Sequence, residues 1–333
     1  MARNKDGRHR RLGAAVYGGA LLGIALLLYL AVRADLPAML HSLELGGVRL
    51  LWLIPYRCAY FLLYAVGWFA LLRPYDPQRR AGLAYTFWVT SVREAADRLL
   101  PVASVGGSVI GVRLLRWRGL PAAGAGATVI VEILLTLIVL YLFTATGLLL
   151  LSGLGAGGHI YRRMLFGFLL SLPAPAALLL VLRYGSVFQR IESLLRPLVG
   201  ESALTERAAS LDSEVRSTLG RGWTLTFAGA LQLIAVVSSS FEIWFAMRLF
   251  GHPIGVSDAL VLESLTQAVR HVAFIVPAGV GVQEAGLVLF GHLLGINGEL
   301  ALAVSMAKRL REVLCGLPPL ISWQWLEGRR LRA

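Results

Sequence analysis

The stretch FIVPAGVGVQEAG, Phe274–Gly286, decides how this chain has to fold. It holds a proline, three glycines and a carboxylate between two apolar runs. Proline and glycine interrupt helices. In hydrocarbon the freed backbone N–H and C=O groups find no partner. A break at this place therefore has to be covered by protein or has to line a cavity.

The composition is that of a polytopic membrane protein. Of the 333 residues, 57% are hydrophobic and 15% are charged, whereas soluble domains are about a quarter charged. Several apolar runs have the length of a membrane span. The polar segment at about 184–222 is too short for a separate catalytic domain and predicts amphipathic helices on the cytoplasmic face. We therefore expect one transmembrane domain over residues 1–333.

The basic balance does not indicate nucleic acid as a partner. The net charge is +13, but the arginines lie between apolar spans, as the positive-inside rule requires. Cys58 and Cys315 lie in separate apolar segments, which predicts packing, not a disulfide. The sequence has no phosphate-binding Gly-Lys-Ser/Thr loop, no Gly-x-Ser-x-Gly elbow and no His/Cys/Asp cluster at metal spacing. We expect no cofactor, no metal and no enzymatic activity.

Hydropathy predicts an all-α fold with six full transmembrane helices and two broken segments. The full spans are expected at about 12–32, 49–72, 121–151, 161–183, 223–250 and 298–326. The broken segments, about 83–118 and 257–296, each have a proline-glycine interruption near the middle. We interpret both as re-entrant helical hairpins, because irregular backbone survives in a membrane only where protein or a cavity covers it.

The distribution of basic residues supports this topology. If each hairpin returns to its own side, the cytoplasmic segments hold twenty Arg and Lys residues, against four on the opposite face. Both termini are then cytoplasmic. The order of span, hairpin and span occurs twice, at about 49–151 and 223–326, in opposite orientations. Inverted repeats with broken helices are the architecture of many secondary transporters.

The first hairpin carries charges beside its break. Arg93 and Asp97, and likewise Glu94 and Arg98, are four residues apart, so each pair shares a helix face. The break itself is expected at Pro101, Gly106 and Gly107. The charges belong either to a polar lining of a lipid pathway or to a short helix at the headgroup level.

The second hairpin repeats the pattern. Glu263, Gln267 and Arg270 form one helical stripe before the break. The break is expected at Pro277, Gly279 and Gly281, and Gln283 and Glu284 begin the returning helix. An acid at a helix start can be a simple cap, because the first N–H groups are free there. That alternative does not explain why a polar stripe precedes the same break.

The last span adds cations within the membrane. Lys308, Arg311 and Glu312 fall on one helix face and Arg309 lies off it. We expect the carboxylates Glu284 and Glu263 to be their partners. In the first half, Glu132 is the matching acid, with Arg93 or Arg98 as its partner. A purely structural network of buried ion pairs is the alternative to a headgroup pathway.

The motifs LLPVASVGGSVIGVRLLRWRGLP, AFIVPAGVGVQEAGLVLFGHLLGI and AKRLREVLCGLP resemble the signature regions of the lysylphosphatidylglycerol synthase transmembrane (flippase-like) family. Within that family the likeness is to the hopanoid-biosynthesis-associated HpnL-type membrane proteins, over nearly the whole chain. The matching positions are Pro101, Gly106, Gly107, Glu132, Pro277, Gly279, Gly281, Gln283, Glu284 and Arg309. Ser108 and Ile133 stand where the family often has an acid and an arginine.

The resemblance implies a lipid-handling protein of the bacterial inner membrane. We expect a transporter for hopanoids or a related envelope lipid, with membrane lipids and proteins of the hopanoid pathway as partners. The alternative is an accessory subunit of a lipid-modifying or export complex. The aminoacyl-transferase domain that some relatives carry is not expected here, so synthase activity does not follow from the likeness.

Overall fold

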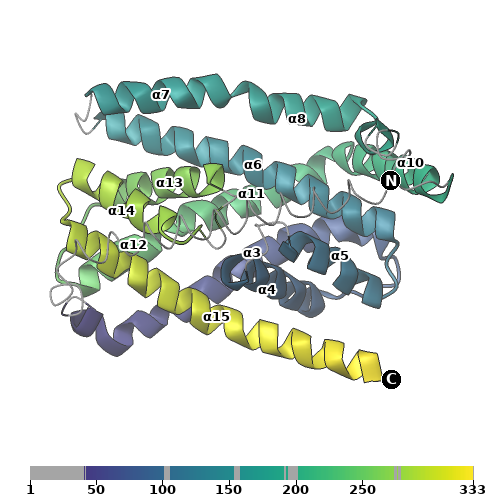
Figure 1. Cartoon of the computed structure of the whole chain (residues 1–333), viewed down its shortest axis with the longest axis horizontal. Coiled ribbons are helices and arrows are strands. Elements are labelled where there is room, and N and C mark those ends of the chain that lie inside the picture. The colour runs from purple at the N-terminus through teal and green to yellow at the C-terminus, as the bar shows by residue number, and fades with distance from the viewer. Residues whose placement is uncertain are drawn as a thin grey trace, which may run out of the picture.

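The computed structural model describes residues 41, 43–100, 106–153, 158–190, 193, 202–273, 276 and 279–332. Within these ranges the secondary structure is helical throughout (Figure 1). The expected first span, 12–32, and the prolines at 101 and 277 lie outside the described residues.

The first half contains helices η1, α3, η2, α4, α5 and α6. Their bounds are η1 Gly47–Trp52, α3 Leu53–Leu72, η2 Arg73–Tyr75, α4 Leu83–Leu99, α5 Gly106–Trp117 and α6 Ala122–Gly153. The middle of the chain adds α7 His159–Ser171, α8 Pro173–Tyr184 and α10 Ser202–Leu219. The second half contains α11 Gly222–Ser238, α12 Ser240–Leu249, α13 Val256–Val272, α14 Val282–Leu293 and α15 Gly298–Arg332.

Four of the described helical stretches are long and apolar enough to cross a membrane. They are Leu43–Tyr75, Ala122–Gly153, Tyr161–Tyr184 and Gly222–Leu249, and they correspond to four of the six predicted spans. The stretch predicted at 298–326 is helical, as part of α15, but it is not among these four. Four charged residues between positions 308 and 312 lower its apolarity, so its crossing of the membrane stays a prediction.

Each broken segment folds as two antiparallel helices. In α4–α5 the Tyr85 hydroxyl donates to the Leu114 carbonyl (2.7 Å), and the Gly107 N–H donates to Asp97 near the turn (2.9 Å). In α13–α14 the Arg270 guanidinium donates to Gln283 at 2.9 Å. Both broken segments are therefore helix pairs within the bundle, and their re-entrant course in a membrane stays a prediction.

The buried apolar side chains form two large clusters, one toward each end of the molecule. The first cluster draws on α12, α13, α14 and the start of α15, and the second on α4, α5, α10 and α11. Helices α3 and α6 contribute to both: α6 places Leu148 and Leu151 in the first cluster and Val131 and Leu134 in the second. These two helices thus connect the halves.

One end of the molecule gathers segments that are far apart in the sequence. Figure 1 places α10 and the C-terminus at this end, and the start of α7 and helices α12 and α14 toward the other. The Tyr75 hydroxyl bonds the Thr218 hydroxyl there (2.7 Å), and the guanidinium carbon of Arg330 lies 4.1 Å from the Trp117 ring centroid. The C-terminal ends of α3, α5 and α10 therefore lie at a single end, together with the C-terminal part of α15.

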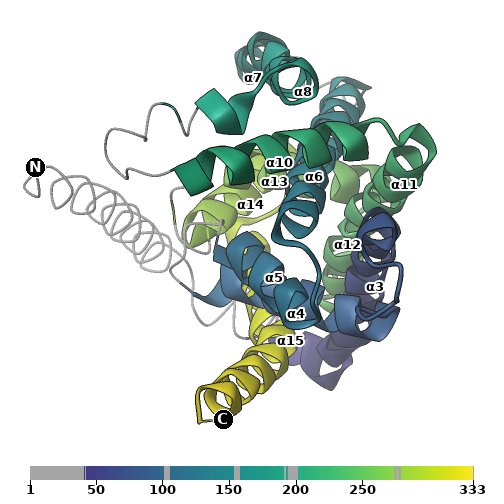
Figure 2. The same ribbon diagram turned by 90° about the vertical axis from the view of Figure 1, so that its right-hand side faces the viewer.

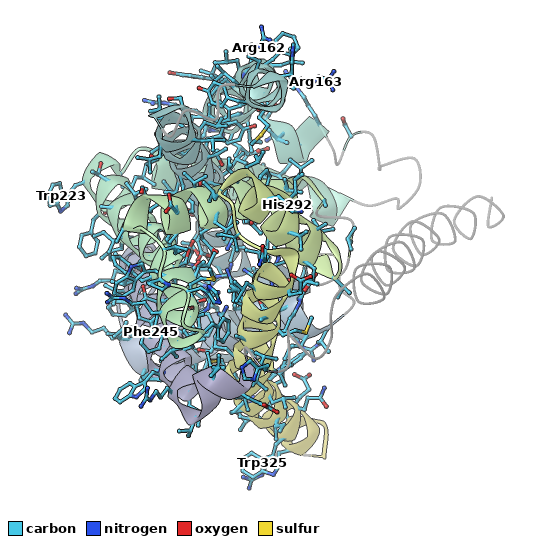
Figure 3. All side chains as sticks on the ribbon, turned by 90° about the vertical axis from the view of Figure 1, so that its left-hand side faces the viewer. Arg162, Arg163, Trp223, Phe245, His292 and Trp325 are labelled. Carbon is cyan, nitrogen blue, oxygen red and sulfur yellow. The ribbon has the colours of Figure 1, made fainter. Side chains whose placement is uncertain are left out.

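Helices α7 and α8 lie at the edge of the bundle (Figure 2). Their stretch Tyr161–Tyr184 is apolar, yet only 6% of its most apolar window is buried within the protein. Figure 3 shows Arg162 and Arg163 pointing outward from this pair, and Trp223 and Trp325 projecting from the bundle. Exposed apolar helices with tryptophans at the surface are typical of a lipid-facing exterior.

Candidate functional site

The break in the first hairpin follows from its local sequence. Helix α4 ends at Leu99, and Leu100 is extended (φ −103°, ψ 150°), as expected for the residue before a proline. A Cβ on Gly107 would lie 2.3 Å from the Arg93 carbonyl oxygen. Glycine is therefore required at position 107 for the two helices to cross this closely.

Of the two residue pairs that share a face of α4, one forms an ion pair in the structure. Arg98 Nε donates to Glu94 Oε1 at 2.9 Å, which confirms that pair. Arg93 is not paired with Asp97, the acid four residues later on the same face: its Nη1 binds Glu132 Oε2 on α6 at 2.6 Å. Asp97 faces the turn because its carboxylate accepts the Gly107 N–H. The predicted match between Glu132 and Arg93 is thus confirmed.

The stripe on the second hairpin is held by hydrogen bonds along α13 and to its neighbours. The Gln267 amide donates to Glu263 at 2.9 Å, four residues earlier. Arg270 Nη1 reaches Gln283 Oε1 on α14 and Glu312 Oε1 on α15, at 2.9 and 3.3 Å. The stripe therefore connects α13 to both elements that follow it.

The return of the chain uses glycine for its backbone conformation. Gly279 and Gly281 have φ values of +58° and +78°, which L side chains rarely adopt. Helix α14 starts at the next residue, Val282. The second break therefore depends on glycine through its dihedral angles, whereas the first depends on close approach.

Glu284 is fully buried and binds α15. Its Oε1 accepts from Ser305 Oγ at 2.9 Å and from Arg309 Nε at 3.1 Å. Ser305 in turn accepts from the Gln283 amide at 3.1 Å. The partners of this carboxylate belong to another helix, so the cap interpretation does not describe its contacts.

Helix α15 supplies the counter-charges for the second hairpin. Lys308 pairs with Glu263, as predicted, and both side chains are buried. The partner of Glu284 is Arg309, which helical geometry had placed off the shared face. An arginine side chain is long and flexible enough to reach around the helix. Arg309 also binds the Gly279 carbonyl oxygen at 3.0 Å.

Two buried charges at the site, Arg57 and Glu242, were not predicted. Arg311 pairs with Glu242 of α12 at 2.9 Å. Arg57 of α3 binds Glu94 at 2.9 Å and lies 3.9 Å from Glu242. A lone charge within an otherwise apolar span is costly and marks a candidate functional residue, and this signal could have identified both.

Glu312 is the centre of the network. Its carboxylate lies within 3.4 Å of Arg98, Arg270 and Arg309. These three arginines come from the first hairpin, the second hairpin and α15. A single buried acid therefore connects the charges of both halves.

A cavity of about 320 Å³ lies between the two hairpins. Helix α3 contributes Tyr60 and Tyr64 to its wall, and the remaining described lining comes mainly from α4, α6 and α13. Its charged lining residues are Arg93, Glu94, Asp97, Arg98, Glu132 and Arg270. The described lining does not include Glu263, Gln283, Glu284, Lys308, Arg309, Arg311 or Glu312. The predicted site residues thus divide into a cavity wall and a buried support behind it.

The rim of this cavity includes Ile133, which is 48% exposed, and His271. His271 Nδ1 lies 2.8 Å from the Gln267 carbonyl oxygen. Because α6 is a candidate membrane span, an exposed isoleucine on it is suited to contact with hydrocarbon. The cavity therefore combines a polar interior with an apolar rim.

Within the described ranges, no group of three or more His, Cys, Asp and Glu side chains is placed to hold a metal ion. Cys58 and Cys315 are free thiols. The arrangement can bind a polar group through paired charges, hydroxyls and amides.

Comparison with known proteins identifies the family. Neither the curated proteins nor the solved structures include a match to this chain. The family model described as the lysylphosphatidylglycerol synthase TM region matches residues 15–317, a range that contains both hairpins and the cavity. The chain is therefore a multi-pass membrane protein that belongs to the lysylphosphatidylglycerol synthase transmembrane-region family, which is flippase-like.

Proposed function

We propose that this protein moves a lipid across the bacterial inner membrane without carrying out chemistry on it. The observation that carries the proposal is the cavity of about 320 Å³ between the two hairpins. Its size is at the lower end of the range for small-molecule sites. Paired charges can solvate a polar headgroup there, while the apolar rim at Ile133 leaves room for an acyl or polycyclic tail.

The proposed topology places the hairpins in the membrane as re-entrant elements. We assign the end with α10 and the C-terminus to the cytoplasm, because Arg73, Arg113, Arg183 and Arg329 belong to segments at that end. The first hairpin then enters from the cytoplasm and the second from the opposite face. The repeats at about 49–151 and 223–326 would be inverted, with both termini cytoplasmic.

The proposed substrate is a hopanoid or a related envelope lipid. Support comes from the likeness of the hairpin motifs to the HpnL-type proteins, whose members are associated with hopanoid biosynthesis. Proteins of that pathway are the proposed partners. The second candidate is an accessory subunit of a lipid-modifying or export complex, and the barely buried pair α7–α8 favours it by offering a surface for another membrane protein.

A reconstituted assay tests the proposal. The purified protein is placed in liposomes that contain a fluorescent hopanoid or phospholipid, and an impermeant quencher reports movement between leaflets. We expect the wild type to accelerate the exchange and Glu132→Gln to slow it, because Arg93 loses its partner in the cavity wall.

The matched control is Glu327→Gln, which removes an acid paired with the exposed Arg113 away from the cavity. This variant should retain wild-type exchange. A folded wild-type protein that leaves the exchange rate of every lipid unchanged would overturn the transporter proposal and favour the accessory role.

A further inference from the structure

The buried charges around the cavity balance each other. The cations are Arg57, Arg93, Arg98, Arg270, Lys308, Arg309 and Arg311, and the acids are Glu94, Asp97, Glu132, Glu242, Glu263, Glu284 and Glu312. Every acid except Asp97 lies within 4 Å of a cation in this set. The formal charges of the set therefore cancel before any ligand binds.

The cavity wall shows the same balance. Its described lining contains the cations Arg93, Arg98 and Arg270 and the acids Glu94, Asp97 and Glu132. His271 is counted as neutral, as it is in the formal net charge of the chain. Residues 101–105, 274, 275, 277 and 278, which lie outside the described residues, include no ionisable side chain. None of them can alter the formal charge of the wall.

A neutral wall in a medium of low dielectric constant discriminates against net charge. An unpaired ion pays a desolvation penalty that only a counter-charge offsets. Within this wall Arg93 binds Glu132 and Arg98 binds Glu94. Arg270 binds Glu312, which lies behind the wall. A headgroup with a net charge would have to displace one of these partners, whereas a neutral group needs only hydrogen bonds.

The lining also offers uncharged hydrogen-bonding groups. Thr90, Ser108, Thr136, Ser239 and Gln267 belong to it. The Thr90 hydroxyl and the side-chain amide oxygen Oε1 of Gln267 have no hydrogen-bond partner within the described ranges. A hydroxyl can donate to an amide oxygen and exchange hydrogen bonds with another hydroxyl.

We infer that the cavity selects lipids whose headgroups carry no net charge, either hydroxyl-bearing or zwitterionic. The inference rests on the proposed transport function and specifies its substrate class. Ser108 is the specificity position in this scheme. It lies in the first turn of α5, lines the cavity and bears no charge, so a charge introduced there alters the balance without breaking an existing ion pair.

The test compares headgroup charge in liposomes that contain the full-length protein. The probes are four fluorescent lipids that share one acyl chain: a glucosyl diacylglycerol, a phosphatidylcholine, a phosphatidylglycerol and a trimethylammonium diacylglycerol. We expect one or both of the first two to move at least about tenfold faster than either charged lipid, which corresponds to ~1.4 kcal/mol. Comparing the exchange rates of the first two lipids distinguishes selection of a hydroxyl-bearing headgroup from selection of a zwitterion.

Variants at position 108 sharpen the test. Ser108→Asp should shift the preference about tenfold toward the cationic lipid, and Ser108→Lys about as far toward the anionic one. Ser108→Asn, which changes size but not charge, should keep the wild-type order. Thermal unfolding of each variant establishes that it is folded.

The outcomes separate the two proposals. If the wild type moves a charged lipid fastest, the inference on charge is wrong and the transport function stands. If the folded protein moves no lipid, both proposals fail. If Ser108→Asn alters the preference as strongly as Ser108→Asp, size rather than charge decides selection and the inference is overturned.

Discussion

The two hairpins share a plan but differ in how deeply their charges are buried. In α4–α5 the side chains of Glu94 and Arg98 are 28% and 18% exposed, and both line the cavity. In α13–α14 the side chains of Glu263 and Glu284 are 1% and 0% exposed, and they bind α15. The first hairpin thus presents charge to a ligand, whereas the second uses charge to attach itself to a long helix.

This difference separates recognition from support. A partly exposed charge at a cavity retains some solvent and tolerates rearrangement. A fully buried acid depends on its partner, because removing one member of a buried pair leaves the other without compensation. Changes in the second hairpin should therefore affect stability more, and changes in the first should affect transport more.

The largest effect is expected at Glu284. Glu284→Gln should lower the free energy of unfolding by about 3–5 kcal/mol, because Arg309 then keeps only Glu312 as a counter-charge in the buried network. Asp97→Asn in the first hairpin should cost only about 1 kcal/mol, because the amide oxygen can still accept the Gly107 N–H. Thermal or denaturant unfolding in detergent measures both values.

A double-mutant cycle isolates this pair. Glu284→Gln combined with Arg309→Gln should cost less than the sum of the two single variants. Arg309, not Arg311, is the correct partner for this experiment, since Arg311 binds Glu242. Wild-type stability of Glu284→Gln would make the acid dispensable and would remove the proposed contrast between the hairpins.

The glycines should show the next largest effect, for different reasons in each hairpin. Gly107→Ala forces α4 and α5 apart and should cost about 1–3 kcal/mol. Gly281→Ala strains a backbone with φ of +78° and should cost about 1–2 kcal/mol. Gly82→Ala is the control, because its φ is −64° and nothing lies within 4 Å of the added Cβ. The free energy of unfolding is measured for the three variants side by side. If Gly82→Ala were the most destabilising, the roles assigned to Gly107 and Gly281 would be wrong.

The ion pair in the cavity wall should contribute less to stability than Glu284 does. Arg93→Gln should reduce lipid exchange severalfold but cost only about 1–3 kcal/mol, because the pair with Glu132 is partly accessible from the cavity. Measuring exchange and unfolding on the same preparation gives both quantities. A loss of stability equal to that of Glu284→Gln, with normal exchange, would reverse the roles assigned to the hairpins.

The smallest perturbation tests orientation. Single cysteines at Gly158 and His252, in a background with Cys58 and Cys315 replaced, should react with an impermeant thiol reagent added outside intact cells. Cysteines at the exposed Ser213 and at Gly328 should react only after the membrane is opened. External labelling at Ser213 would contradict the assignment of the first hairpin to the cytoplasmic side.

The helices and their breaks could be predicted because they follow from local sequence. The lengths of the apolar runs predicted four of the candidate spans, and the positions of glycine and proline predicted where both turns lie. The pairing of Lys308 with Glu263 also followed, because few buried acids are available to a buried lysine. Each of these features depends on the sequence of a single element, or on the free-energy cost of leaving a buried charge unpaired.

The rest required knowledge of how helices are placed side by side. Arg57 and Glu242 are visible in the sequence as lone charges in apolar runs, but only the packing of α3, α12 and α15 shows that they lie close together. Arg93 had two acids within reach in principle, and the crossing of α4 with α6 selects Glu132. The cavity depends on the same packing, so its wall could be predicted only in part.

The shared use of α3 and α6 by both apolar clusters has a mechanical consequence. A helix of 32 residues such as α6 is a beam about 48 Å long, and here it is fixed near both ends. Rocking one half against the other would require this beam and α3 to bend or their clusters to shear. The short hairpin helices α5 and α14, each of 12 residues, can move with much less bending and less disruption of the two clusters. We therefore expect movements of the hairpin helices to open and close access to the cavity, while α3 and α6 keep their positions.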